Sequence, residues 1–240
     1  MKKEFNILCF FGIICLASAN KASFITKCKW DDSKCIKDST QAAIPVMAQG
    51  IPELGVEKMD PLVLKEVDAS KPNLKLNIRN IKLEGLKDCL AQNMERDIAK
   101  SKLFVNILCT GKLVADYEMK GQLLLLPIEG KGAMRATLNE ILIHAEADIE
   151  EKVGKDSKNH WNIKKWKHEF ELKGKSSVEF DNLFGGNEVL GKAVKDLIAT
   201  NGNEVIIDVG QEIVTAVVEK VAKNCNKLFH AIPLEDLVIS

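Results

Sequence analysis

The sequence predicts an α+β fold in which a highly curved antiparallel β-sheet wraps a long C-terminal α-helix. Three observations support this fold class. Residues 74–172 contain several runs of alternating apolar and polar side chains, the pattern of strands with one buried face. Residues 204–229 carry apolar side chains at every third or fourth position, as a long helix does. Apolar side chains cover more than half of the circumference of that helix, so it needs a partner that curves around it. The sheet is the other large element that could do so.

The composition of the 240-residue chain excludes several classes of protein. Hydrophobic residues make up 46% and charged residues 28%, which is typical of a folded domain. The 34 Lys and Arg residues balance 34 Asp and Glu residues, whereas a nucleic-acid-binding protein would carry a basic excess. The sequence also contains no nucleophile elbow, no phosphate loop and no spacing of metal ligands. We therefore predict a protein that is not an enzyme, has no catalytic residue, cofactor or metal, and does not bind nucleic acid.

Residues 1–19 have the features of a secretory signal peptide. Two lysines precede an apolar run at residues 7–16, and residues 17–19 have the small side chains of a cleavage site. The run is shorter than the roughly 20 residues that a membrane span needs, and no later stretch approaches that length. We predict a secreted, extracellular protein without a transmembrane segment, in which residues 20–240 form a single domain and a monomer.

Export places the five remaining cysteines in an oxidising compartment, where one of them must stay unpaired within the chain. Cys28 and Cys35 are close enough in the sequence for a small disulfide loop. Cys89 and Cys109 are equidistant from Ala99, the centre of a predicted hairpin turn, so a cross-strand disulfide is one interpretation. The other, which we favour, is a pair of small buried hydrophobic side chains.

The first regular element is predicted at residues 31–49, which suit a helix with an apolar side. Asp31, Asp32 or Ser33 could cap its N-terminus, and Pro45 is expected to kink or end it. Glycines and prolines then break regular structure before the sheet begins.

The strands of the sheet follow from the alternating runs. At residues 74–83 the alternation changes phase near Asn80, which predicts a β-bulge and a strongly bent strand. Gly111 and Gly121 separate the next apolar runs. These runs predict strands at residues 103–108, 113–119 and 123–128.

The last strands and the helices complete the prediction. Residues 143–149 and 165–172 each have one apolar and one charged face, and they form a natural antiparallel pair. Everything after Asn187 is predicted to be helical. A short amphipathic helix at residues 190–198 is separated from the long one by Asn-Gly-Asn at residues 201–203.

Two stretches of the sequence resemble the insect haemolymph juvenile-hormone-binding and takeout family. They are YEMKGQLLLLPIEGKG at residues 117–132 and DNLFGGNEVLG at residues 181–191. Cys28 and Cys35 occupy the positions at which that family has its N-terminal disulfide, and residues 233–237 resemble its C-terminal tail. The likeness spans essentially the whole mature chain. It is takeout-like, because the second disulfide of moth-type hormone carriers has no clear counterpart here.

The resemblance implies an apolar tunnel between sheet and helix that holds a hydrophobic small molecule. The implied ligands are juvenile hormone or a similar terpenoid, a fatty acid, or a prenyl quinone, and the implied location is haemolymph or another extracellular fluid. We predict a ligand site at Met47, Met134, Ile143, Ala145, Ala147, Trp166, His168, Phe170, Val217 and Val221. The sequence therefore favours a secreted carrier, and the alternative is a protein-interaction or membrane-lipid-binding module with a packed interior.

Several of these residues also have a plain structural interpretation. Ala145 and Ala147 either leave room for a ligand or accommodate the bulky side chains opposite them. His168 either donates a hydrogen bond to an ester, epoxide or carbonyl of the ligand or is a core residue with a protein partner. Methionines mould around a lipid chain or fill gaps in an ordinary core. Trp30 either covers a tunnel mouth or packs on the first helix.

Overall fold

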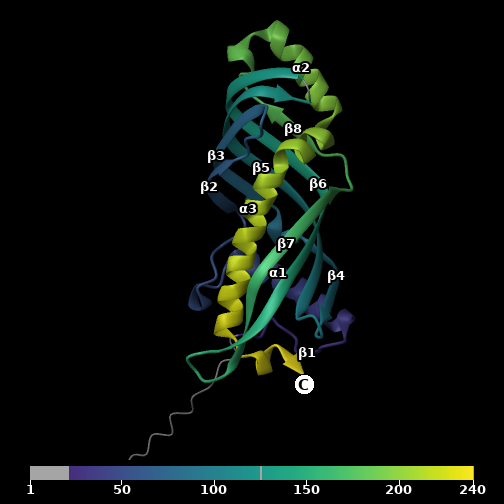
Figure 1. Cartoon of the computed structure of the whole chain (residues 1–240), viewed down its shortest axis with the longest axis vertical. Helices are drawn as coiled ribbons and strands as arrows, with labels where there is room; N and C mark the ends of the chain where they lie inside the picture. The colour runs from purple at the N-terminus through teal and green to yellow at the C-terminus, as the bar shows by residue number, and fades with distance from the viewer. Residues whose placement is uncertain (1–21, 125, 240) are drawn as a thin grey trace, which may run out of the picture.

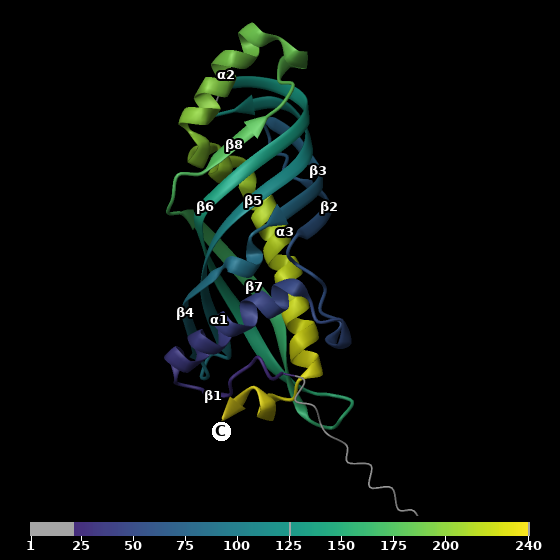
Figure 2. The same cartoon turned by 180° about the vertical axis from the view of Figure 1, so that it is seen from behind.

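The computed structural model describes residues 22–124 and 126–239, and the predicted signal peptide lies outside them. Helix α3 (Gly202–Ala231) runs along the molecule, and the strands curve around one side of it (Figure 1, Figure 2). The predicted architecture, a long C-terminal helix wrapped by a curved antiparallel sheet, is confirmed.

The described residues form a sheet of seven strands in the order β2-β3-β5-β6-β7, with β4 paired to β5 and β8 paired to β6. The strands are β2 (Leu62–Asp68), β3 (Leu74–Glu84), β4 (Leu90–Asp97), β5 (Lys102–Leu123), β6 (Leu126–Val153), β7 (Asn159–Leu172) and β8 (Ser177–Phe180). Near its turn the long β5–β6 hairpin pairs with β3 and β8, and at its other end with β4 and β7. We call the first half the α2 end and the second half the α1 end, after the helices that lie there (Figure 1).

The two shorter helices cover opposite ends of the sheet. Helix α1 (Ser33–Gln49) begins after Asp32, whose side chain accepts a backbone N–H of the first turn, and it continues through Pro45. The Gln41 amide hydrogen-bonds the backbone at the start of β4, which attaches α1 to the sheet. Helix α2 (Glu188–Thr200) lies against β8 at the other end (Figure 1).

Two predicted irregularities are confirmed. The pairing of β3 with β5 shifts register between Arg79 and Lys82, and Asn80 has a φ of 51°. This is the β-bulge expected from the change of phase, and it bends β3 so that the sheet can curve around α3. The predicted break between the C-terminal helices lies at Asn201, which separates α2 from α3.

The three strands predicted at residues 103–128 are arranged differently. The first two are one continuous strand, β5, because a register shift beside Gly111 absorbs that glycine without ending the strand. The third contains the hairpin reversal, since β5 ends at Leu123 and β6 begins at Leu126. The prediction was wrong here because four consecutive leucines carry none of the Gly, Asn or Pro signals that usually mark a hairpin turn.

Gly121 is required where β5 passes the start of β3. Its φ is 145°, a conformation that L side chains rarely adopt, and a Cβ there would lie 2.2 Å from the Asn73 carbonyl oxygen. This glycine therefore permits the close approach of the two strands at the α2 end.

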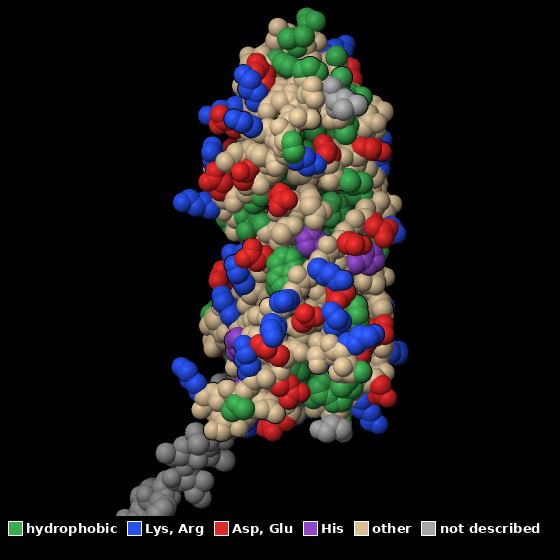
Figure 3. Space-filling view, viewed as in Figure 1, with side chains coloured by type: hydrophobic (Ala, Val, Ile, Leu, Met, Phe, Trp, Pro, Cys, Tyr) green, Lys and Arg blue, Asp and Glu red, His purple; other side chains and the backbone are tan. Residues whose placement is uncertain are grey.

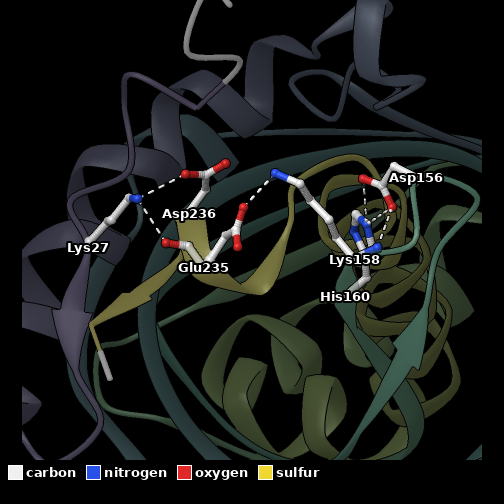
Figure 4. A network of polar contacts seen from close by, with 6 residues as sticks. All are labelled: Lys27, Asp156, Lys158, His160, Glu235 and Asp236. Atoms are coloured by element: carbon white, nitrogen blue, oxygen red, sulfur yellow. Dashed lines mark hydrogen bonds and ion pairs between the residues drawn. The ribbon is translucent and has the colours of Figure 1, made fainter.

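The ends of the described chain meet at the α1 end. Strand β1 (Cys28–Lys29) pairs in parallel with β9 (Val238–Ile239). The Lys27 ammonium donates to the Glu235 carbonyl oxygen at 2.8 Å and to Asp236 Oδ1 at 2.9 Å (Figure 4). Short 3-10 turns complete the fold at Pro52–Leu54, Leu86–Asp88, Phe184–Gly186 and Leu234–Asp236.

The outer surface mixes charges of both signs. Figure 3 shows Lys, Arg, Asp and Glu side chains interspersed over the face seen in Figure 1, with apolar side chains gathered at the tip of the α2 end. Val189 and Leu190, in the first turn of α2, are 83% and 54% exposed. Among the described residues, no helix is long and apolar enough to cross a membrane.

Candidate functional site

The interior is packed differently at the two ends. At the α2 end, inward-facing side chains of β3, β5 and α3 are buried, as Leu76, Ile78, Tyr117 and Val205 show with at most 2% exposure. On β5 this burial alternates regularly with exposed residues on the outer face. The α2 end is therefore filled by its own side chains, as ordinary protein cores are.

At the α1 end the inward-facing residues lie in rows across the strands. Met94, Val105, Ala145 and His168 form one row, and Ala91, Ile107, Ile143 and Phe170 form the next. The His168 ring contacts Thr215 of α3, so this face of the sheet looks toward the helix. The members of both rows on β5, β6 and β7 are only half-buried, although they face the interior.

The structure brings most of the predicted site residues together. Six of them share the inward face of β6 and β7 at the α1 end: Ile143, Ala145, Ala147, Trp166, His168 and Phe170. Val217 and Val221 are half-buried on α3, in the half of the helix nearer its C-terminus. Met47 is buried near the end of α1. Met134 is not part of this group: it pairs with Phe180 of β8 in the packed α2 end, about 30 Å from Ile143 along β6.

His168 is oriented by the helix. Its Nε2 lies 2.9 Å from Thr215 Oγ1, and that hydroxyl donates its own proton to the Gln211 carbonyl oxygen. Nε2 must therefore carry the ring proton and donate it to Thr215, which leaves Nδ1 as an acceptor. Nδ1 is buried and has no hydrogen-bond partner among the described residues. Burial lowers the pKa of His168, so the ring is neutral near pH 7.

Arg96 forms a second polar feature on the same interior face. Its position on β4 pairs with Leu103 of β5, in the row that continues through Ala147 to Trp166. The guanidinium carbon lies 5.7 Å from the ring centroid of Trp30 and 5.7 Å from that of Trp161.

The hydrogen bonds of this cluster are incomplete. Arg96 Nη1 donates to the Lys102 carbonyl oxygen at 3.0 Å. Arg96 Nε and Trp161 Nε1 are both buried donors without a partner in the described part of the chain. Burial lowers the pKa of Arg96, and the negative charges of Glu151 and Asp97 act in the opposite direction.

The sequence does not reveal this cluster or the contribution of β4 and β5 to the site. The run at residues 103–108 is apolar on both faces, so its alternation does not reveal which side faces inward. Trp30 does not simply pack on α1, since its ring lies 5.6 Å from that of Trp161. The partners of Arg96 come from segments far apart in the sequence, and no local pattern connects them.

Both disulfides lie at the α1 end. The predicted Cys28–Cys35 bridge is confirmed. Cys89 and Cys109 are also bridged, with their Cα atoms 4.4 Å apart, so the favoured interpretation of two small hydrophobic residues was wrong. The β4–β5 hairpin register places them opposite each other, one residue beyond the pair of Leu90 and Leu108. Among the described cysteines, Cys225 is free.

The sheet is not closed, and α3 fills the opening between the edge strands β2 and β7. A groove of about 630 Å³ follows the seam between β2 and α3. Glu57 links the segment before β2 to α3 through ion pairs with Lys227 and Lys220. These two lysines hold the pKa of its carboxyl group below the ordinary value. The Asn224 side chain hydrogen-bonds both backbone groups of Glu57. Within the residues described, no group of three or more His, Cys, Asp or Glu could hold a metal ion.

The chain was compared with families, proteins and structures that are already known. It matches the family model described as haemolymph juvenile hormone binding protein over residues 7–239. It is 25% identical over 228 residues to the circadian clock-controlled protein daywake of Drosophila yakuba, covering 90% of this chain and 84% of that protein. The crystal structure of Takeout 1 from Epiphyas postvittana matches with a TM-score of 0.86 and 28% identity, covering 90% of this chain and 100% of that one. The chain therefore belongs to the haemolymph juvenile hormone binding protein family, as a takeout-like member.

Proposed function

We propose that the protein is a secreted carrier that binds one hydrophobic small molecule between α3 and the α1 end of the sheet. The observation that carries the proposal is the contrast between the two ends. Inward apolar side chains are buried at the α2 end. At the α1 end Ala91, Met94 and Ala147 are buried too, but the row members Val105, Ile107, Ile143, Ala145 and Phe170 keep accessible surface. Because protein interiors are close-packed, an inward side chain that keeps accessible surface borders unfilled space.

Cys225 of α3 supports the same proposal. Burial raises the pKa of its thiol to about 11, which requires protein around it. The residue is nevertheless only half-buried in its accessible surface. Cys225 therefore combines an apolar environment with some accessible surface, which an apolar guest could cover.

The surroundings suit a lipid-like ligand. Ala145 and Ala147 place small side chains on the inward face, opposite Val105 and Leu103 respectively. Burying about 300 Å² of apolar ligand surface at about 25 cal/mol per Å² would contribute roughly 7 kcal/mol before ordering costs. The expected ligands are juvenile hormone or a similar terpenoid, a fatty acid, or a prenyl quinone, in line with the family to which the chain belongs.

Binding is tested by displacement of a fluorescent lipid from the purified protein and from the variant Ala145→Phe. We expect saturable one-to-one uptake by the wild type. In the variant, uptake should fall at least about tenfold while the melting temperature changes by only a few degrees, because the new ring occupies unfilled space.

The matched control is Ala136→Phe, on the same strand in the packed α2 end, where the alanine is buried. Overpacking there should cost about 1–3 kcal/mol of folding stability. If Ala145→Phe destabilises the protein as much as Ala136→Phe does, the α1 end is packed and the carrier proposal fails. Absence of saturable lipid uptake by the wild type would equally count against it.

Secretion is the second part of the proposal. The two disulfides support it, because such bridges persist in oxidising compartments. Expression of the full chain in insect cells should deliver the protein to the medium with its N-terminus near Asn20. Retention inside the cells with residues 1–19 still attached would contradict this part of the proposal.

A further inference from the structure

Arg96 lies where a ligand in the proposed interior site would end. Its row adjoins the row of Val105 on the inward face, and the row of Ile107 lies next. Ile107 is four residues, about 13 Å, from Leu103 along β5. A chain-like molecule lying along these rows would bring one end to the guanidinium.

Among the described residues, no carboxylate forms an ion pair or hydrogen bond with Arg96. Glu151 and Asp97 influence it only from farther away. One of its N–H groups donates to a backbone carbonyl, and its Nε is a buried donor without a partner. Buried donors are normally satisfied, so this cluster has unused capacity for an acceptor.

The aromatic rings restrict how an acceptor can approach. Trp30 and Trp161 both lie against the guanidinium, where cation–π attraction stabilises the positive charge. Trp161 Nε1 adds a second unpartnered donor from β7, and the Phe229 ring packs edge-on against that indole, with the ring centroids 5.5 Å apart. No protein acceptor within the described residues occupies these two buried donors, and a carboxylate matches the fork of a guanidinium.

We propose that Arg96 and Trp161 Nε1 bind the carboxylate of an amphipathic lipid acid whose apolar chain lies between α3 and the inward rows of β5 and β6. This inference rests on the proposed carrier function and assigns the ligand class. A carboxylate accepts the unused hydrogen bonds and neutralises the arginine. An ester or a hydrocarbon offers no charge to the arginine, so the protein should prefer the acid.

The test compares cis-parinaric acid with its methyl ester as fluorescent ligands at about pH 7.5, where the carboxyl group is ionised. The wild type should bind the acid at least about tenfold more tightly than the ester. Arg96→Met should weaken binding of the acid by about 10- to 100-fold and change binding of the ester by less than about twofold. Arg96→Lys should keep part of the preference, because it keeps the charge but not the fork.

The matched control is Arg79→Met, which removes an exposed arginine on the outer face of β3 and should leave both affinities unchanged. Equal affinity of the wild type for acid and ester overturns the inference, as does an equal loss for both ligands in a folded Arg96→Met variant. If Arg96→Met does not fold, the inference is judged from two other measurements. These are the ratio of acid affinity to ester affinity in the wild type and the same ratio in Arg96→Lys. If neither ligand binds the wild type saturably, the carrier function itself fails, which is a distinct result.

Discussion

His160 holds the β6–β7 turn against the C-terminal part of α3. Its Nδ1 lies 3.0 Å from the Phe229 carbonyl oxygen. Its Nε2 lies 3.0 Å from Asp156 Oδ1, a contact shown in Figure 4. Both partners are acceptors, so the ring can donate to both only as an imidazolium. Burial lowers the pKa of His160, but the hydrogen bonds to these partners outweigh that effect and raise it overall.

This arrangement predicts a pH dependence of stability. Because the folded-state pKa of His160 is raised, its contribution is complete below the unfolded-state value of about 6.5 and is lost as the pH rises through the folded-state value. We expect His160→Gln to lower the free energy of unfolding by about 1–2 kcal/mol near pH 6 and to lose less stability than the wild type on going to alkaline pH.

Urea unfolding between about pH 5.5 and 8.5 measures this difference. His230→Gln is the control, since His230 is exposed and hydrogen-bonds the Asn162 side chain. If the free energies of unfolding of the wild type and of His160→Gln change in parallel with pH, then His160 is not held as an imidazolium.

At the scale of elements, β4 depends on three attachments. It pairs with β5 on one side, α1 lies along it, and the Cys89–Cys109 disulfide joins the residue before it to β5. Its pairing with β5 also contains a register shift between Ala91 and Asn93, which removes one regular step of the ladder. The disulfide therefore holds the strand beside an irregular part of the pairing.

Removing this disulfide should destabilise the protein and loosen β4 first. For the variant Cys89→Ala with Cys109→Ala, we expect a loss of about 3 kcal/mol, the value typical of a loop of about 20 residues. Guanidinium unfolding measures the loss, and hydrogen exchange of the β4 amides should show faster opening than in the wild type. The control is Cys225→Ala, which removes a free thiol, and equal stability of the two variants would contradict this role for the bridge.

The whole molecule combines a solid end with an end whose inward side chains keep accessible surface. Leu76, Ile78 and Val205 fill the α2 end, whereas Ile143 and Phe170 at the α1 end remain half-buried. Both ends use the same two long strands and the same helix, so they form one continuous framework. A ligand in the proposed site would complete the packing of one end without any need to rearrange the other.

Ligand binding should therefore stabilise the protein unevenly. At a free concentration of about 100 times the dissociation constant, a lipid should raise the free energy of unfolding by about 2.7 kcal/mol. Hydrogen exchange with and without the lipid should show added protection in β4, β7 and the C-terminal half of α3, with little change in β3 and β8. Added protection confined to the α2 end would place the ligand elsewhere.

The sequence alone determined most of the elements, since the periodicity of strands and helices is a property of neighbouring residues. It placed the bend at Asn80, the long C-terminal helix, and His168 on the same face as Trp166 and Phe170. It failed at the leucines around the β5–β6 turn, because a reversal made of apolar residues has no local signal.

Only the tertiary structure decided how the faces meet. Met134 and Ile143 lie on one strand, but Met134 is buried in the packed end and Ile143 belongs to a half-buried row at the other end. Arg96 gains its aromatic partners Trp30 and Trp161 from distant segments. The physical reason is that burial and electrostatic environment depend on what lies opposite a side chain in space, and periodicity specifies only the face on which that side chain lies.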